Sequence, residues 1–252
     1  MRHALITAGT KGLGRKVSEA LKEKGYTLTI TYRKKDEAYY RMKEQWEEDS
    51  SRIQFVQGDM VSKQDVERMV EEAYKAFGRL DIVVNNAGPY IFEKKQLADY
   101  SDEEWHRMID GNLSAAFHLA RKAIPIMRRQ QFGRFVTYGF QNAPTAPGWL
   151  YRSAYAAAKS GLVSLTKSIS IEEAAHGITA NMVCPGVVTG DFKEADIHEG
   201  REVTDHSIPV GRPATGGDIA RTILFLTDDD ADMITGSVIE VTGGVDVLHK
   251  HR

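Results

Sequence analysis

The first 24 residues contain the pattern that most restricts the fold of this 252-residue chain. Residues 4–7 are apolar and predict a strand, residues 8–14 form a glycine-rich turn, and a helix pattern follows up to Lys24. Amide groups at the start of a helix, together with its positive dipole end, can hold a pyrophosphate, and glycines let phosphates approach closely. Strand, glycine turn and helix in this order therefore predict a nucleotide-binding unit.

Strand and helix patterns alternate along the rest of the chain. Further strands are predicted at residues 27–32, 53–57, 80–84, 133–138, 178–183 and 237–242, and helices at 36–48, 62–77, 101–129, from near 155 to 176, and 218–226. Ser62 with Asp65 and Ser101 with Glu104 resemble capping boxes, and Pro125 predicts a kink or break in the helix at 101–129. The alternation predicts one α/β domain over residues 1–252, a Rossmann-type doubly wound sheet of about seven parallel strands with helices on both faces.

Ligands of such sheets bind beyond the carboxyl ends of the strands, and the distinctive residues of this chain fall there. They include the glycine turn, Asp59, residues 85–88 and Pro185-Gly186. The polar segment at 187–215 lacks clear periodicity and is long for a connection, which is typical of a lid over a substrate.

Composition excludes several classes of function. Net charge is −2 with both signs spread along the chain, which does not favour nucleic-acid binding. No run approaches the length of a membrane span, and no signal peptide precedes the first strand, so we expect a cytoplasmic protein. The single cysteine, Cys184, has apolar neighbours and is expected to be a buried structural thiol. We interpret the terminal residues 249–252 as a solvated tail and expect no metal site.

Tyr155 and Lys159 are four residues apart in a helix pattern, so their side chains can point into the same space. A cation near a phenol favours the phenolate and is expected to lower the pKa of Tyr155 from about 10, toward values useful for proton transfer.

Several motifs together resemble the short-chain dehydrogenase/reductase family, over nearly the whole chain. The family pattern Thr-Gly-x-x-x-Gly-x-Gly is matched by Thr7, Gly12 and Gly14. The further matches are Asn85 to Gly88, Asn112 within Gly-Asn-Leu, Tyr155 with Lys159, Pro185-Gly186, and Thr235-Gly236 with Gly243-Gly244. The layout is most similar to the 3-oxoacyl-(acyl-carrier-protein) reductase group. The resemblance implies a nicotinamide cofactor, a small carbonyl or alcohol substrate, and a homotetramer or homodimer.

The resemblance also implies the residues of the site. Tyr155, Lys159 and Asn112 are the expected catalytic residues, with Asn112 positioning Lys159 through water. The expected cofactor-binding residues are Thr7, Gly9, Lys11, Gly12, Leu13, Gly14, Arg33, Asp59, Met60, Asn86, Ala87, Gly88, Tyr155, Lys159, Pro185, Gly186 and Val188.

The chain departs from the family pattern at two places. The leading glycine of the turn is Ala8, with Gly9 one place later, so the extra methyl either weakens binding or is relieved at Gly9 by a small change in the turn. The family's catalytic serine falls on Phe140, which cannot hydrogen-bond a substrate oxygen, and the interval to Tyr155 is two residues longer than usual. Removing one donor of this kind can cost about 10²–10³ in rate.

Several residues could replace the missing hydroxyl. Gln141 is the preferred candidate because it lies one residue from Phe140 and its amide can donate. The other candidates are Thr137, Tyr138, Asn142, Tyr151 and Ser153. Alternatively, Phe140 and Gln141 only shape the pocket.

Charge predicts NADP(H) rather than NAD(H). NAD-selective sites place an acid at the end of the second strand, whereas Arg33, Lys34 and Lys35 stand here, ahead of Asp36. Lys11 adds a cation within the turn, and such groups suit the 2′-phosphate of NADP.

The leading hypothesis is an NADP(H)-dependent oxidoreductase, of class EC 1.1.1.-, that interconverts a carbonyl and an alcohol, with a 3-oxoacyl thioester as a candidate substrate. Tyr151 does not give the Tyr-x₆-Lys spacing associated with enoyl reductases in the family, which disfavours that activity. The alternative is a nucleotide-binding member with impaired or no turnover, acting as a cofactor sensor or assembly partner, because the serine is missing.

Overall fold

The computed structural model describes residues 1–246 and 248, and its centre is one parallel sheet of seven strands. The strand order is β3-β2-β1-β4-β5-β6-β7. The strands are β1 (His3–Ile6), β2 (Thr27–Tyr32), β3 (Ile53–Gln57), β4 (Ile82–Asn85), β5 (Gly133–Tyr138), β6 (Ile178–Pro185) and β7 (Val238–Val241). The predicted doubly wound α/β fold with about seven parallel strands is confirmed.

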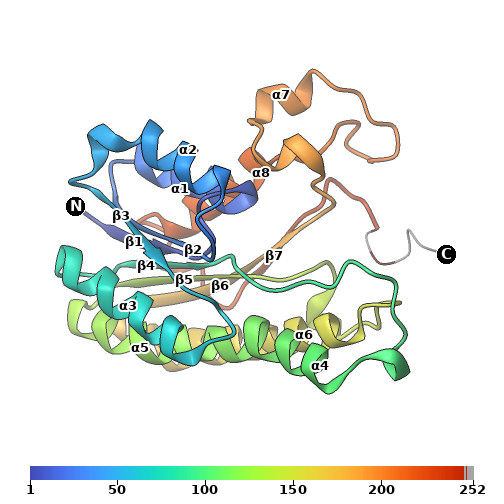
Figure 1. Ribbon diagram of the computed structural model, residues 1–252, viewed down its shortest axis with the longest axis horizontal. Coiled ribbons are helices and arrows are strands. Elements are labelled where there is room, and N and C mark those ends of the chain that lie inside the picture. Colours follow the sequence, from blue (N-terminus) through green and yellow to red (C-terminus); the bar gives the residue numbers. More distant parts are fainter. Residues whose placement is uncertain (247, 249–252) are drawn as a thin grey trace.

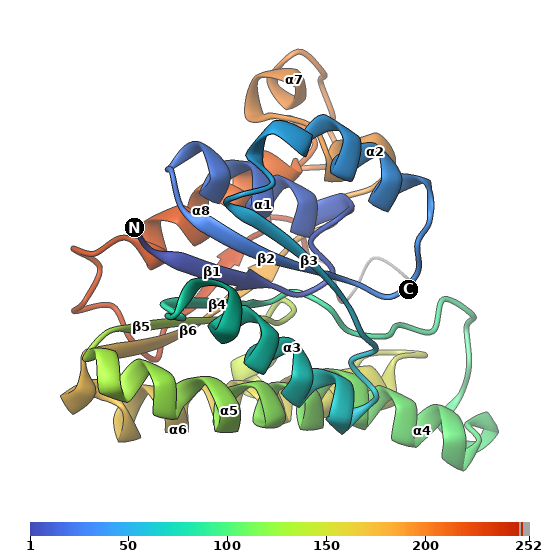
Figure 2. The same cartoon turned by 60° about the vertical axis from the view of Figure 1, so that its left-hand side comes forward.

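Helices cover both faces of the sheet (Figures 1 and 2). One face carries α1 (Gly12–Glu23), α2 (Glu37–Gln45) and α8 (Gly216–Thr227), and the other carries α3 (Lys63–Phe77), α5 (Ala115–Gln130) and α6 (Ser153–Glu172). The short α4 (Asp102–Ile109) precedes α5, and α7 (Ile197–Arg201) lies beyond the α1 face. None of the described helices is long and apolar enough to span a bilayer.

Burial on both faces explains why the strands are short continuous apolar runs. Leu5 and Val83 belong to the core under α3 and α5, whereas Ile6 and Val84 belong to the core under α1 and α8. The strand order reverses between β1 and β4, where Ile6 pairs with Val84. Crevices of such sheets form at this reversal, so the ends of β1 and β4 define the expected binding edge.

Two local predictions hold only in part. The helix at 101–129 does not break at Pro125, because α5 continues through this residue. It is interrupted instead by a π turn at Asp110–Ser114, which separates α4 from α5. The Ser101–Glu104 capping box is confirmed. Ser62 accepts a bond from the amide of Asp65, but the Asp65 carboxylate binds the amide of Asp59, so that box is only half formed.

The glycine turn is strained at Ala8. Its φ is +50°, in the left-handed region that favours glycine, while Gly9 does not take a positive φ. The amides of Ala8 and Gly9 donate to the hydroxyl and carbonyl oxygens of Thr31 on β2, which hold the turn in place. Ala8 itself therefore carries the strain, rather than Gly9, and the effect of its methyl group on binding stays a prediction.

We predict that Ala8→Gly stabilises the protein. A non-glycine residue in the left-handed region costs about 1–2 kcal/mol of stability, which the substitution removes. The greater freedom of glycine in the unfolded chain cancels about 0.4–1 kcal/mol of this stabilisation. The melting temperature should rise by about 1–3 °C. The matched control, Ala76→Gly at an exposed position of α3, should lower it. A lower melting temperature for Ala8→Gly would contradict the assignment of strain.

Candidate active site

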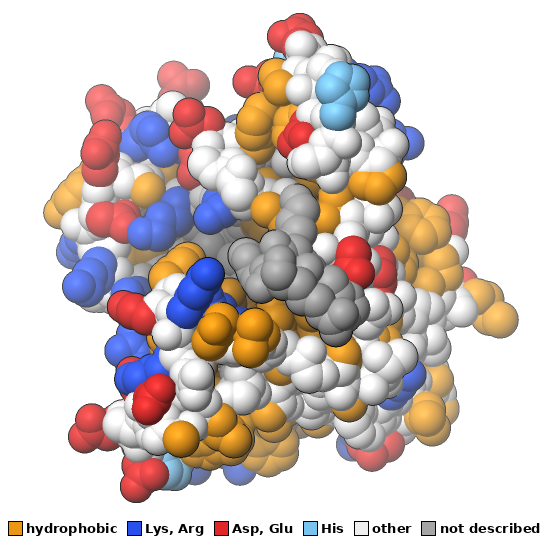
Figure 3. All heavy atoms as spheres, turned by 90° about the vertical axis from the view of Figure 1, so that its right-hand side faces the viewer, with side chains coloured by type: hydrophobic (Ala, Val, Ile, Leu, Met, Phe, Trp, Pro, Cys, Tyr) orange, Lys and Arg blue, Asp and Glu red, His pale blue; other side chains and the backbone are white. Residues whose placement is uncertain are grey.

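A groove of about 930 Å³ runs along the carboxyl edge of the sheet. Figure 3 faces this edge and shows Lys and Arg side chains beside a recess. Of the predicted site residues, Lys11, Arg33, Asp59, Met60, Ala87 and Gly88 line the groove. Tyr90 also lines it, on the loop that follows β4. The groove therefore joins the cationic end of the predicted cofactor site to the end of β4.

Hydrogen bonds join the glycine turn to the loop after β4. The amide of Ala87 donates to Thr7 Oγ1 over 2.8 Å. The Asn86 side chain donates to the carbonyl oxygens of Thr7 and Ala8, at 3.0 and 3.3 Å. A Cβ on Gly14 would lie 2.3 Å from the Ala8 oxygen, so glycine is required there for close packing. Thr7, Asn86 and Gly14 thus shape the turn.

Asn112 lies in the π turn between α4 and α5 and is buried. Its Nδ2 donates to the carbonyl oxygens of Pro89 and Met108, at 2.9 and 3.0 Å. Its Oδ1 is buried and finds no partner among the described residues, and a Cβ on Gly88 would approach this oxygen to 2.2 Å. Asn112 therefore holds the loop that follows Gly88.

Tyr155 and Lys159 lie on one face of α6, with Lys159 Nζ 5.6 Å from the Tyr155 ring centroid. Burial raises the pKa of Tyr155 above its ordinary value. The expected net lowering of this pKa is therefore wrong for the protein as it stands, because desolvation of the phenolate dominates and Tyr90 and Cys184 add to the rise. Burial also lowers the pKa of Lys159 to about 8.

Aromatic rings surround Tyr155. Ring centroids of Tyr90, Trp149 and Phe140 lie 5.0, 6.0 and 6.5 Å from that of Tyr155. Phe140 is buried and its ring lies 5.1 Å from that of Trp149. Phe140 thus lies beside Tyr155, as expected from its alignment with the family's serine, and places a hydrocarbon surface there.

The proposed replacements for the serine differ in their surroundings. Thr137 Oγ1 and Thr166 Oγ1 share a hydrogen bond. Tyr138 packs into the core under α1 and α8, whereas Tyr155 packs against a different cluster of buried residues. The Asn142 side chain is exposed. Tyr151 takes a positive φ before α6, and the Ser153 hydroxyl is buried at the start of that helix. Gln141 is half-buried directly after Phe140, and its role stays a prediction.

The cationic end of the groove contains one acid that the sequence interpretation did not place there. Lys11 Nζ and an Asp36 carboxylate oxygen are 2.7 Å apart, and Asp36 also caps α2 through the amide of Tyr39. Arg33 and Lys34 are exposed beside this pair. The groove therefore keeps an excess of positive charge at this end.

The segment at 187–215 is fastened to the glycine turn. A Glu194 carboxylate oxygen accepts a bond from the Gly12 amide over 2.7 Å. The same side chain lies 3.5 Å from Arg15 and 3.3 Å from Arg41. Pro185 ends β6, and Gly186 packs against the backbone of Thr242, where a Cβ would approach to 2.8 Å. The lid function of the segment stays a prediction.

The sequence interpretation missed Tyr90 and Arg152. Arg152 Nε donates to the Tyr90 hydroxyl oxygen over 2.6 Å, and its other nitrogens donate to the carbonyl oxygens of Phe92 and Glu93. The position of Tyr90, two residues after the Asn-Asn-Ala-Gly motif and beyond the end of β4, was the available signal. Arg152 carried no comparable signal.

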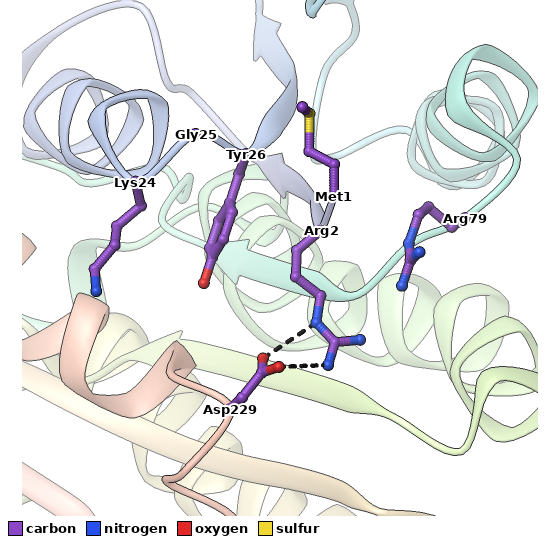
Figure 4. A pocket seen from close by; sticks show the side chains of 7 residues that line it. All are labelled: Met1, Arg2, Lys24, Gly25, Tyr26, Arg79 and Asp229. Atoms are coloured by element: carbon purple, nitrogen blue, oxygen red, sulfur yellow. Dashed lines mark hydrogen bonds and ion pairs between the residues drawn. The ribbon is translucent and has the colours of Figure 1, made fainter.

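A second cavity, of about 500 Å³, lies at the opposite edge of the sheet (Figure 4). Its lining residues are Met1, Arg2, Lys24, Gly25, Tyr26, Arg79 and Asp229. Arg2 binds Asp229 at this cavity, and no predicted site residue lines it. The candidate chemistry therefore belongs to the groove at the carboxyl edge.

Two further predictions concern the thiol of Cys184 and metal binding. Cys184 is buried, as expected, and burial raises the pKa of its thiol to about 12. Among residues 1–246 and 248, no group of three His, Cys, Asp or Glu side chains could hold a metal ion. The terminal tail at 249–252 lies outside the described residues.

Comparisons with known proteins agree with the fold and the motifs. A family model described as enoyl-(acyl carrier protein) reductase matches residues 7–246. The Bacillus subtilis (strain 168) protein YtkK, provisionally named an oxidoreductase, is 59% identical over 100% of this chain and 99% of its own. The 3-oxoacyl-[acyl-carrier-protein] reductase FabG of Staphylococcus aureus (strain Mu50 / ATCC 700699) is 34% identical over 97% of this chain and 98% of its own.

A solved structure from Bacillus thuringiensis, described provisionally as a 3-oxoacyl-reductase, superposes with a TM-score of 0.94. It is 57% identical and covers 99% of this chain and 100% of its own. Because the family model and these relatives span nearly the whole sequence, the chain belongs to the short-chain dehydrogenase/reductase family of oxidoreductases.

Proposed function

We propose that the protein is an NADPH-dependent reductase of a small carbonyl compound, with 3-oxoacyl thioesters as the first substrate class to test. The observation that carries this proposal is the half-buried Tyr155 with the buried Lys159, beside Tyr90, which lines a groove whose other end is cationic. Lys159 follows Tyr155 by four residues, and the longer spacing associated with enoyl reduction does not occur. The relatives named as 3-oxoacyl reductases support the same choice.

The residues of the groove fit a dinucleotide. Gly88 leaves no room for a side chain against Asn112, and Lys11, the N-cap residue of α1, lines the groove. The Gly12 amide at the start of α1 is bound by Glu194, so it would hold a phosphate only after that bond opens. Arg33 and Lys34 would hold the 2′-phosphate, and Asp59 with Met60 would line the adenine end. NADPH, when bound, supplies a hydride for the carbonyl carbon of the substrate.

The protein's own contribution is proton transfer. Because burial raises the pKa of Tyr155, its phenol stays protonated at neutral pH and can donate to the oxygen as the carbonyl π bond is reduced. The Lys159 cation stabilises the phenolate that remains until solvent returns the proton. Asn112 fixes the loop that lies against this pair.

The second candidate function is a cofactor sensor with little turnover. Phe140 beside Tyr155 favours it, because a hydrocarbon ring replaces a hydrogen-bond donor at the reacting oxygen. The two functions differ in one measurement, turnover relative to cofactor affinity.

We predict that Tyr155→Phe loses most reductase activity while its NADPH affinity stays within about threefold of that of the wild type. Loss of one general acid removes roughly 10²–10⁴ in rate. Oxidation of NADPH followed at 340 nm and a fluorescence titration would measure the two quantities. Full activity in Tyr155→Phe would refute the role given to this tyrosine.

We predict that carbonyl reduction declines at high pH. Lys159 has its pKa lowered to about 8, so it loses its charge above that pH, whereas Tyr155 remains protonated. The plot of kcat against pH should be flat near neutrality and fall above about pH 8, approaching tenfold per unit. Lys159→Arg keeps its charge and should move the decline to higher pH. A decline at the same pH in that variant would assign it to another group.

We predict that Arg33→Ala weakens NADPH binding about 10- to 100-fold and leaves NADH binding nearly unchanged, since a charge-assisted bond contributes about 1.5–3 kcal/mol. Arg201→Ala, on α7, is the matched control at another exposed position. Isothermal titration would measure both cofactors. Equal weakening of NADPH and NADH would contradict recognition of the 2′-phosphate.

A further inference from the structure

The proposed reductase needs a hydrogen-bond donor that Phe140 cannot supply. A carbonyl oxygen gains negative charge during reduction, and a second donor besides Tyr155 stabilises that charge. The donor must lie next to the Tyr155 ring, reach the groove and have a proton that is not already used within the protein. Tyr90 has all three properties.

Tyr90 stands between the groove and Tyr155. It lines the groove, and its ring meets that of Tyr155 edge-on, with centroids 5.0 Å apart and planes at 83°. The backbone around it is held from two sides, because Asn112 binds the carbonyl oxygen of Pro89 and Arg152 binds those of Phe92 and Glu93. Tyr90 is thus a positioned side chain rather than a loop residue free to move.

The bond from Arg152 determines what the Tyr90 hydroxyl can do. A guanidinium group has donors and no acceptor, so Arg152 Nε is the donor and Tyr90 Oη the acceptor in their 2.6 Å bond. A phenol that accepts this bond retains its own proton for another partner. Donation from a cation also polarises the phenol and makes it a better donor.

We propose that Tyr90, oriented by Arg152, donates a hydrogen bond to the same substrate oxygen that receives the proton of Tyr155, in place of the missing serine. This inference rests on the proposed reductase function. No covalent bond of Tyr90 changes: its O–H stays intact, the hydride adds to the carbonyl carbon, and Tyr155 supplies the proton to the oxygen. Tyr90 is then a catalytic residue and Arg152 a positioning residue.

The principal test is Tyr90→Phe, which keeps the ring and removes only the hydroxyl. We expect kcat on an acetoacetyl thioester to fall about 10²-fold with a change in KM below about threefold, because the bond strengthens as charge develops on the oxygen. NADPH affinity by fluorescence should stay at its wild-type value, and a cooperative melting transition checks that the variant folds. Tyr26→Phe, at the opposite edge of the sheet, is the matched control and should leave kcat unchanged.

Arg152→Gln tests the positioning role. We expect a roughly tenfold loss in kcat when it is introduced alone and no further loss when it is added to Tyr90→Phe, because the two residues act through one hydroxyl. Independent, multiplying losses would assign Arg152 a separate structural role and would overturn its part of the proposal.

Restoring the family's serine gives a second test. Phe140→Ser added to Tyr90→Phe should recover at least tenfold in kcat relative to Tyr90→Phe alone. The melting temperature of each variant checks that it folds. Absence of recovery in a folded double variant would count against a shared role of the two positions.

The outcomes separate this inference from the proposed function. Turnover in the wild type with an unchanged kcat in Tyr90→Phe would overturn the role of Tyr90 and leave the reductase intact. NADPH binding without turnover in the wild type, on acetoacetyl thioesters, diketones, quinones and aldehydes, would overturn both.

Discussion

The site depends on the hydrogen bonds that join the turn after β1 to the loop after β4. The Thr7 hydroxyl accepts from Ala87, and Asn86 holds the carbonyl oxygens of the turn. These hydrogen bonds join the two loops where the strand order reverses, so that the glycine turn and residue 88 form one surface. Asn112 then packs against Gly88 and binds the Pro89 carbonyl, which brings Tyr90 up to Tyr155. One continuous set of contacts therefore links the glycine turn to the proposed reaction centre.

The aromatic surroundings of Tyr155 determine its electrostatics. Phe140, Trp149 and Tyr90 pack around the Tyr155 ring, and desolvation raises its pKa and lowers that of Lys159. A protonated phenol beside a cationic lysine is the state that carbonyl reduction needs. A polar serine in place of Phe140 would supply a donor and weaken this desolvation. Phe140 in the position of the serine therefore fits a site in which Tyr90, on the loop after β4, supplies the second hydrogen-bond donor.

The sequence predicted the fold because alternating strands and helices leave few ways to bury both faces of a sheet. It also placed Tyr155, Lys159, Asn112 and Phe140, since each lies in a motif or a fixed register. It missed what tertiary contacts decide. The π turn at Asp110–Ser114 has no periodicity signal, so a kink or break was expected at Pro125. The Lys11–Asp36 pair and the strain at Ala8 depend on how the turn meets β2. The bond from Arg152 to Tyr90 spans 62 residues, and no local pattern indicates it.

Transfer of deuterium from [4,4-²H₂]NADPH, labelled at both C4 positions, to a 3-oxoacyl thioester tests the central claim most directly. The purified protein would be incubated with the labelled cofactor and an acetoacetyl thioester, and the product analysed by mass spectrometry. We expect a 3-hydroxyacyl product with deuterium on the new carbinol carbon, and none from Tyr155→Phe. Tight NADPH binding with no labelled alcohol from the thioester, or from diketones, quinones and aldehydes, would contradict the reductase function and favour a cofactor sensor.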